Sequence, residues 1–113
     1  VALGGSAMYK AANNLDLRVA SEVFADRAYN LDGTLVSRKI KGAVIEDPTK
    51  VKKRVLNMIK NGEVKTINGE ILRLKADTVC VHGDNPSAIK LVKELVKELE
   101  KNKIEITAMK NIV

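Results

Sequence analysis

Four side chains that could do chemistry lie close together in the stretch VASEVFADRAYNLDGTLV, residues 19–36. Glu22 and Asp26 carry carboxylates, which can act as a general base or hold a metal ion. Arg27 carries a guanidinium, which binds carboxylates and phosphates through paired hydrogen bonds. Tyr29 adds a phenol that could contact a substrate or the loop. In the structural alternative, Arg27 ties Glu22 or Asp26 and so holds the long loop that follows.

A second cluster contains His82, the only histidine in the chain, and Asp84. An unperturbed imidazole titrates near pH ~6.5, which suits a group that takes up and releases protons. Asp84 could orient this histidine, hold a metal ion or contact a substrate. In the structural alternative, Asp84 or Asn85 caps the helix that starts at Pro86. Arg38 is a further candidate for a substrate or loop contact.

Two other features fit structural roles better than chemical ones. Gly4-Gly5-Ser6 resembles a cradle of backbone amides for an anion, but a simple capped turn explains it equally well. It is not a Walker-type phosphate loop, because no lysine follows at the required spacing. Cys80 is expected in the core, and a single cysteine with a single histidine argues against a structural zinc site.

Alternating helices and strands must position these side chains. Helices are predicted at residues 6–14, 47–61 and 86–102, strands at 18–23, 43–45, 78–81 and 104–107, and a hairpin at 63–74. The hairpin is indicated by Asn68-Gly69 between two short apolar runs. The alternation predicts an α/β fold with parallel strands, in which ligands gather at the carboxyl ends of the strands. We therefore expect Glu22, Arg27 and His82 to face one cavity.

The composition fits one globular domain, with 113 residues of which 45% are apolar and 30% charged. The net charge of +6 would suit an anionic partner, but the lysines are scattered and the aromatic residues are two tyrosines and one phenylalanine. No nucleic-acid partner is therefore predicted. No apolar run approaches the ~20 residues of a membrane helix, so no membrane partner is predicted either. The single cysteine favours a reducing, cytoplasmic environment.

Three blocks of the sequence together resemble one known family. VASEVFADRAYNLDGTLV is followed by GAVIEDP at 42–48 and by ADTVCVHGDNPSAIKL at 76–91. Their order and spacing are similar to those of the lactam-utilisation family LamB/YcsF, whose members are also called the A subunit of 5-oxoprolinase. The combination of SEVFADRxY with CVHGD is a specific feature of that resemblance. It covers nearly all of the chain, but only about the last half of a family member.

The resemblance implies a fold and a domain organisation. Family members look like irregular (β/α) barrels related to the polysaccharide deacetylases, so this α/β chain is expected to be the C-terminal part of such a barrel. The family's N-terminal motif, Asp-Leu-Asn-x-Asp-x-Gly-Glu, has no counterpart here. Residues 1–113 are therefore expected to be a single partial domain that lacks its N-terminal half and is inactive alone.

The resemblance also implies an activity. With two other 5-oxoprolinase subunits, family members open the lactam ring of 5-oxo-L-proline to L-glutamate, coupled to ATP hydrolysis. ATP is then a co-substrate, bound with Mg²⁺ in the assembled enzyme, and no metal site is assigned to this chain. Phosphorylation of the amide oxygen would activate the ring, and the site then needs a base, cations and oxyanion donors.

Each candidate residue receives a role on this basis. The expected catalytic residues are His82, Glu22 and Asp26. The expected substrate-binding residues are Arg27, Asp84, Tyr29 and Arg38. Two alternatives stay open, namely a metal-dependent amidase or deacetylase of the same barrel class, and a non-catalytic subunit that binds the substrate or docks partners.

Overall fold

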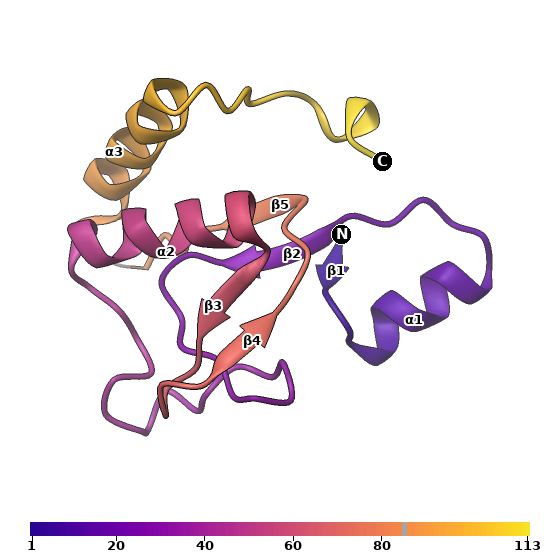
Figure 1. Ribbon diagram of the computed structural model, residues 1–113, viewed down its shortest axis with the longest axis horizontal. Helices are drawn as coiled ribbons and strands as arrows, with labels where there is room; N and C mark the ends of the chain where they lie inside the picture. Colours follow the sequence, from indigo (N-terminus) through magenta and orange to yellow (C-terminus); the bar gives the residue numbers. More distant parts are fainter. Residues whose placement is uncertain (85) are drawn as a thin grey trace.

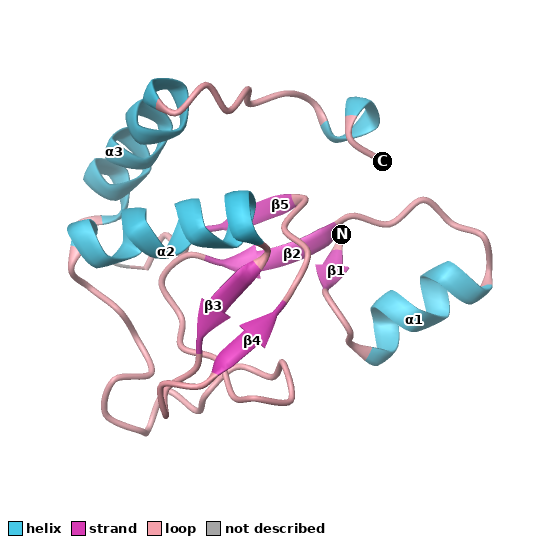
Figure 2. Cartoon of the chain, in the orientation of Figure 1, coloured by secondary structure: helices cyan, strands magenta, loops and turns pink. Residues whose placement is uncertain are grey.

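The computed structural model describes residues 1–84 and 86–113, so Asn85, a predicted helix cap, lies outside the described residues. The elements along the chain are β1 (Ala2–Leu3), α1 (Ala7–Asn14), β2 (Ser21–Phe24), α2 (Pro48–Asn61), β3 (Glu63–Lys65), β4 (Ile71–Arg73), β5 (Thr78–Cys80), α3 (Ala88–Lys101) and the 3-10 helix η1 (Met109–Asn111). Figure 1 shows α2 lying over β2 and β5, with α1 to one side beyond β1. In Figure 2 the hairpin of β3 and β4 lies below α2.

The sheet is parallel, as the sequence predicts. β2 lies in the centre between β1 and β5. Ala2 pairs with Ser21, and Phe24 pairs with Cys80. The carboxyl ends of all three strands therefore meet at one edge of the sheet, and the mixed α/β fold is confirmed.

α2 begins and ends where the sequence predicts. The carboxylate of Asp47 accepts the N–H of Thr49 at 3.0 Å, and Pro48 occupies the first turn. Gly62 ends the helix in the left-handed conformation, with φ of 64°, which glycine adopts without steric cost. The buried side chains that hold α2 in the core are Val51, Val55 and Met58.

The hairpin and the last helix are also confirmed, with shifted bounds for the helix. β3 and β4 pair antiparallel, with Val64 opposite Leu72. α3 begins at Ala88, two residues after the predicted start at Pro86, and ends at Lys101. It joins the same core cluster as α2 through two buried leucines, Leu91 and Leu95.

Two predicted strands do not form. Residues 43–45 lie in the long loop, where Val44 makes only an isolated antiparallel bridge with Arg27. Residues 104–107 have an irregular backbone and run away from α3 towards η1 (Figure 1). Both segments are rich in β-branched residues, but a strand also needs a partner backbone to pair with. Residues 43–45 exchange just two backbone hydrogen bonds with residues 26–28, too few for a ladder, and residues 104–107 belong to neither sheet of the described chain.

Large apolar side chains of the C-terminal segment are exposed, among them Ile106, Met109 and Ile112. Exposed apolar side chains of this kind are expected in a partial domain. That residues 1–113 form a partial domain stays a prediction. In the part of the chain that the structure describes, no helix is long and apolar enough to cross a bilayer.

Gly4→Ala should destabilise the fold, because the added Cβ would lie far inside contact distance of Oγ of Ser21. That oxygen is buried and donates to the carbonyl of Lys75 at 2.8 Å, so it cannot move away at little cost. Ser21→Ala removes the oxygen and leaves the serine Cβ at 3.7 Å, an ordinary contact. In the intact subunit, thermal unfolding measures the free energy of unfolding of each variant. The variant with both Gly4→Ala and Ser21→Ala should lose about 1 kcal/mol less of it than the two single variants lose together. If the losses of the two single variants simply add up in the double variant, the added Cβ does not clash with Oγ of Ser21.

Candidate active site

Asp26 and His82 form a hydrogen-bonded pair just after β2 and β5 end. Nδ1 of His82 lies 2.9 Å from Oδ1 of Asp26, and the backbone N–H of His82 donates to Oδ2 at 3.4 Å. The side chain of Asp26 is 8% exposed and that of His82 is 25% exposed. The carboxylate is therefore shielded from water while the imidazole reaches the surface.

The imidazole is held in one orientation. Its ring stacks on Phe24, with ring centroids 5.5 Å apart and 17° between the planes. Because an ionised carboxylate only accepts hydrogen bonds, Nδ1 of His82 donates to Asp26, which leaves Nε2 as the ring nitrogen that faces away from this bond. This is the arrangement of a general base oriented by a carboxylate.

Arg54, on α2, holds the backbone on both sides of Asp26. Its guanidinium donates to the carbonyls of Phe24 at 3.5 Å, of Ala25, and of Arg27 at 2.7 Å. Sequence reasoning did not find this residue. A signal was present, since Arg54 lies beside the apolar stripe of α2, where a charged group needs buried partners.

Arg27 and Tyr29 are buried within the loop. Nη2 of Arg27 donates to the carbonyl of Val36 at 3.1 Å, and its Nε has no described partner. Tyr29 is 2% exposed, and its hydroxyl accepts the N–H of Phe24 at 2.9 Å. Burial raises the pKa of Tyr29, and the hydrogen bond partly offsets this. Both side chains stabilise the loop, and their predicted contact with substrate stays a prediction.

Arg38 and Asp84 meet across two loops. Nη1 of Arg38 lies 3.3 Å from Oδ2 of Asp84, and the two side chains are 55% and 65% exposed. The structure does not show the orienting role considered for Asp84, because Asp26 is the residue bonded to the imidazole of His82. The expected contact of Asp84 and Arg38 with substrate stays a prediction. The exposed pair contributes little to stability, but it places a guanidinium beside the loop that carries His82.

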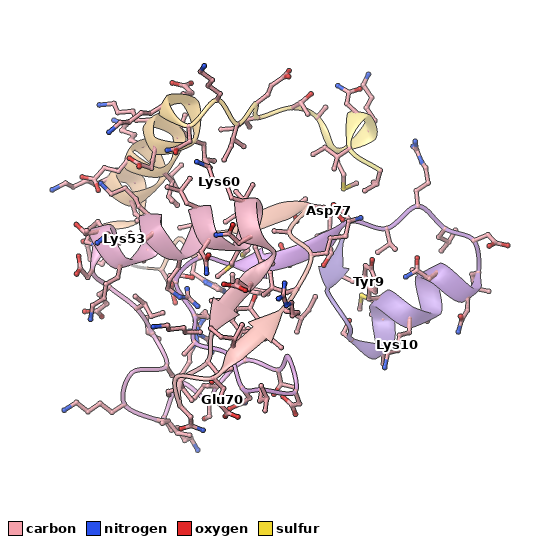
Figure 3. All side chains as sticks on the ribbon, viewed as in Figure 1. Tyr9, Lys10, Lys53, Lys60, Glu70 and Asp77 are labelled. Carbon is pink, nitrogen blue, oxygen red and sulfur yellow. The ribbon has the colours of Figure 1, made fainter. Side chains whose placement is uncertain are left out.

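Glu22 lies inside β2 and not beyond its end, because the strand runs to Phe24. It lines a cavity of about 220 Å³ whose other walls include Tyr9, Tyr29, Arg73 and Lys75. Tyr9 belongs to α1 and is labelled in Figure 3 on the side of the helix nearer β1. Arg27 and His82 do not line this cavity. The single cavity expected for Glu22, Arg27 and His82 is therefore not what the structure shows here.

Cys80 pairs with Phe24 in the sheet and is partly buried, which confirms the predicted core position only in part. Burial raises the pKa of its thiol, and the negative charges of Glu22 and Asp26 raise it further. The thiol is therefore protonated at neutral pH and is a weak nucleophile.

Metal-ligating side chains do not cluster in the described residues. Among residues 1–84 and 86–113, no three His, Cys, Asp or Glu side chains lie close enough together to hold one. Asp26 and His82 supply two donors, which are bonded to each other. Gly4-Gly5-Ser6 forms a capped turn, in which the hydroxyl of Ser6 accepts the N–H of Tyr9 at 3.2 Å.

Comparison with known proteins agrees with the resemblance seen in the sequence. Residues 1–113 match the model of the LamB/YcsF family over their whole length. The chain belongs to the LamB/YcsF family. A relative from Campylobacter jejuni subsp. jejuni serotype O:6, named as the A subunit of 5-oxoprolinase, is 54% identical over 111 residues, which cover 98% of this chain and 44% of the relative.

Two further similar proteins extend the comparison. One from Thermococcus sibiricus, also named as the A subunit of 5-oxoprolinase, is 50% identical over 113 residues, which cover 100% of this chain and 44% of the relative. The crystal structure of a lactam utilization protein from Thermus thermophilus matches with a TM-score of 0.83 and 32% identity, over 92% of this chain and 41% of that chain. The chain thus spans less than half the length of the relatives it matches.

Proposed function

We propose that this chain is part of the A subunit of an ATP-dependent 5-oxoprolinase, which opens the lactam ring of 5-oxo-L-proline to give L-glutamate. The observation that carries the proposal is the pair of Asp26 and His82, with Nδ1 and Oδ1 2.9 Å apart. Hydrolysis of a stable amide needs a base to deliver water. The names of the two 5-oxoprolinase relatives support the same substrate.

In this proposal His82 is the general base. Its Nε2 takes a proton from water while the water oxygen bonds to the lactam carbonyl carbon. The carbon–nitrogen bond of the ring then breaks, and the same proton passes to the leaving nitrogen. Asp26 stabilises the imidazolium present between these steps. ATP first transfers its γ-phosphoryl group to the amide oxygen and leaves as ADP, so this ring opening gives an acyl phosphate, which a second water hydrolyses to L-glutamate and inorganic phosphate.

We further propose that the parallel sheet is part of an irregular (β/α) barrel resembling those of the polysaccharide deacetylases. Within the described chain, β1 and β5 each pair on one side only, so both strands could accept neighbours. The relatives are more than twice as long as this chain, which leaves room for the remaining strands. The rest of the same subunit, together with two partner subunits, would then complete the site and bind ATP with Mg²⁺.

The proposal is tested by assembling the full-length subunit with its partner subunits and supplying 5-oxo-L-proline and ATP. L-glutamate and ADP should form in equal amounts, and omitting this subunit should abolish both. Turnover that needs no ATP and is lost on chelation would favour the metal-dependent amidase. Turnover that needs the subunit but neither Asp26 nor His82 would favour the non-catalytic binding role.

A further inference from the structure

We infer that Arg54 is a positioning residue for the Asp26–His82 pair. The inference rests on the proposed function, in which Asp26 orients the base. Arg54 itself has no described contact with His82. It acts on the backbone that carries Asp26, through carbonyls one and two residues before Asp26 and one residue after it.

Backbone hydrogen bonds hold part of the segment around Asp26. The N–H of Ala25 donates to the carbonyl of Cys80 at 3.0 Å, and the carbonyl of Asp26 accepts the N–H of Ile45 at 2.9 Å. The carbonyls of residues 24, 25 and 27 accept hydrogen bonds from the guanidinium of Arg54. One guanidinium therefore holds three carbonyls around the turn after β2 and so restrains the backbone that carries Asp26.

The charge of Arg54 also acts on the pair. Burial lowers the pKa of the guanidinium, while the nearby phenol of Tyr29 and the carboxylate of Asp26 raise it. None of the ion pairs in the described chain includes Arg54. Its positive charge is therefore available to attract the carboxylate of Asp26 without being neutralised by a closer acid.

Arg54→Met in the assembled full-length enzyme tests the inference. It removes the three hydrogen bonds but keeps an apolar side chain in the space. We expect kcat for 5-oxo-L-proline to fall about 10²-fold, because a small misplacement of a catalytic group has an effect of that size. KM should change by less than about threefold, since Arg54 does not touch the substrate. Lys53→Met, which removes the same charge from an exposed position on the same helix (Figure 3), is the matched control and should leave both unchanged.

A double-mutant cycle separates positioning from general stability. If Arg54 acts through Asp26, adding Arg54→Met to Asp26→Asn should lower kcat by less than about threefold further. If Arg54→Met lowers kcat by the same factor in the parent enzyme and in Asp26→Asn, the inference is overturned. All rates are measured well below the melting temperature of each variant, so that unfolding does not contribute.

Hydrogen exchange gives a readout that does not depend on turnover. The amide of His82 donates to Asp26, so its exchange should accelerate in Arg54→Met and stay unchanged in Lys53→Met. An unchanged rate in both variants would overturn the inference whatever the activity. If His82→Ala is fully active, the proposed function fails, and the exchange experiment still decides whether Arg54 positions Asp26.

Discussion

His82→Ala in the assembled full-length enzyme is expected to lose ATP-coupled opening of 5-oxo-L-proline by about 10²–10⁴-fold, the range typical of a general acid–base group. The substitution removes Nε2, the atom assigned to proton transfer, and leaves the backbone N–H that donates to Asp26. Turnover is followed at saturating ATP, as the L-glutamate formed per subunit.

The stability of this variant should change much less than its activity. The imidazole is partly exposed and loses only its stack on Phe24 and one hydrogen bond to Asp26, together worth about 1–3 kcal/mol. His82→Asn is the matched control, because its side-chain amide can still donate to Asp26 but cannot carry a proton. It should melt closer to the parent and be equally inactive. Full activity with a lowered melting temperature in His82→Ala would show that the histidine is structural.

Asp26→Asn is expected to lower kcat about 10²–10⁴-fold while leaving the overall fold intact. An amide has nearly the same shape as a carboxylate, but it can donate a hydrogen bond to Nδ1 of His82. The imidazole would then carry its proton on Nε2, where it cannot accept one from water. The variant also loses the negative charge that stabilises the imidazolium.

The control for Asp26→Asn is Asp84→Asn, which removes a carboxylate from the loop that carries His82. Asp84 is exposed and pairs with Arg38, not with His82. The Asp84→Asn variant should therefore keep kcat within about tenfold of the parent. If Arg38 and Asp84 contact the substrate, any larger effect should fall on KM. Equal losses of kcat in the two variants would remove the special role of Asp26 and return the orienting role to Asp84.

Sequence reasoning selected Asp26 and His82 as chemical residues but did not pair them. Each follows an apolar, strand-like run, and that pattern is visible in the chain itself. Their contact depends on the alignment of β2 with β5 across 56 residues. Asp84 was the nearer choice in sequence, but its carboxylate is bonded to Arg38.

The buried arginines show a different limit. The sequence predicted a ligand contact for Arg27 and no role for Arg54. An arginine in the sequence does not show whether its guanidinium binds a ligand or is buried against backbone carbonyls. In the fold, Arg27 donates to a loop carbonyl and Arg54 to three carbonyls beside Asp26. The apolar stripe of α2 indicates that Arg54 needs buried partners, but which carbonyls accept from it follows only from how α2 lies on the sheet.

The sequence alone predicted local structure wherever the hydrogen bonds join residues that are only a few positions apart. The caps at Ser6 and Asp47 and the hairpin at Asn68-Gly69 are of this kind. The order of helices and strands also predicted the parallel sheet, and three short blocks identified the family. Tertiary structure alone decided that residues 43–45 and 104–107 are not strands in this chain, and that Asp26 is the partner of His82. Strand pairing and side-chain pairing both depend on which distant segment comes alongside, and that is settled only when the whole core has packed.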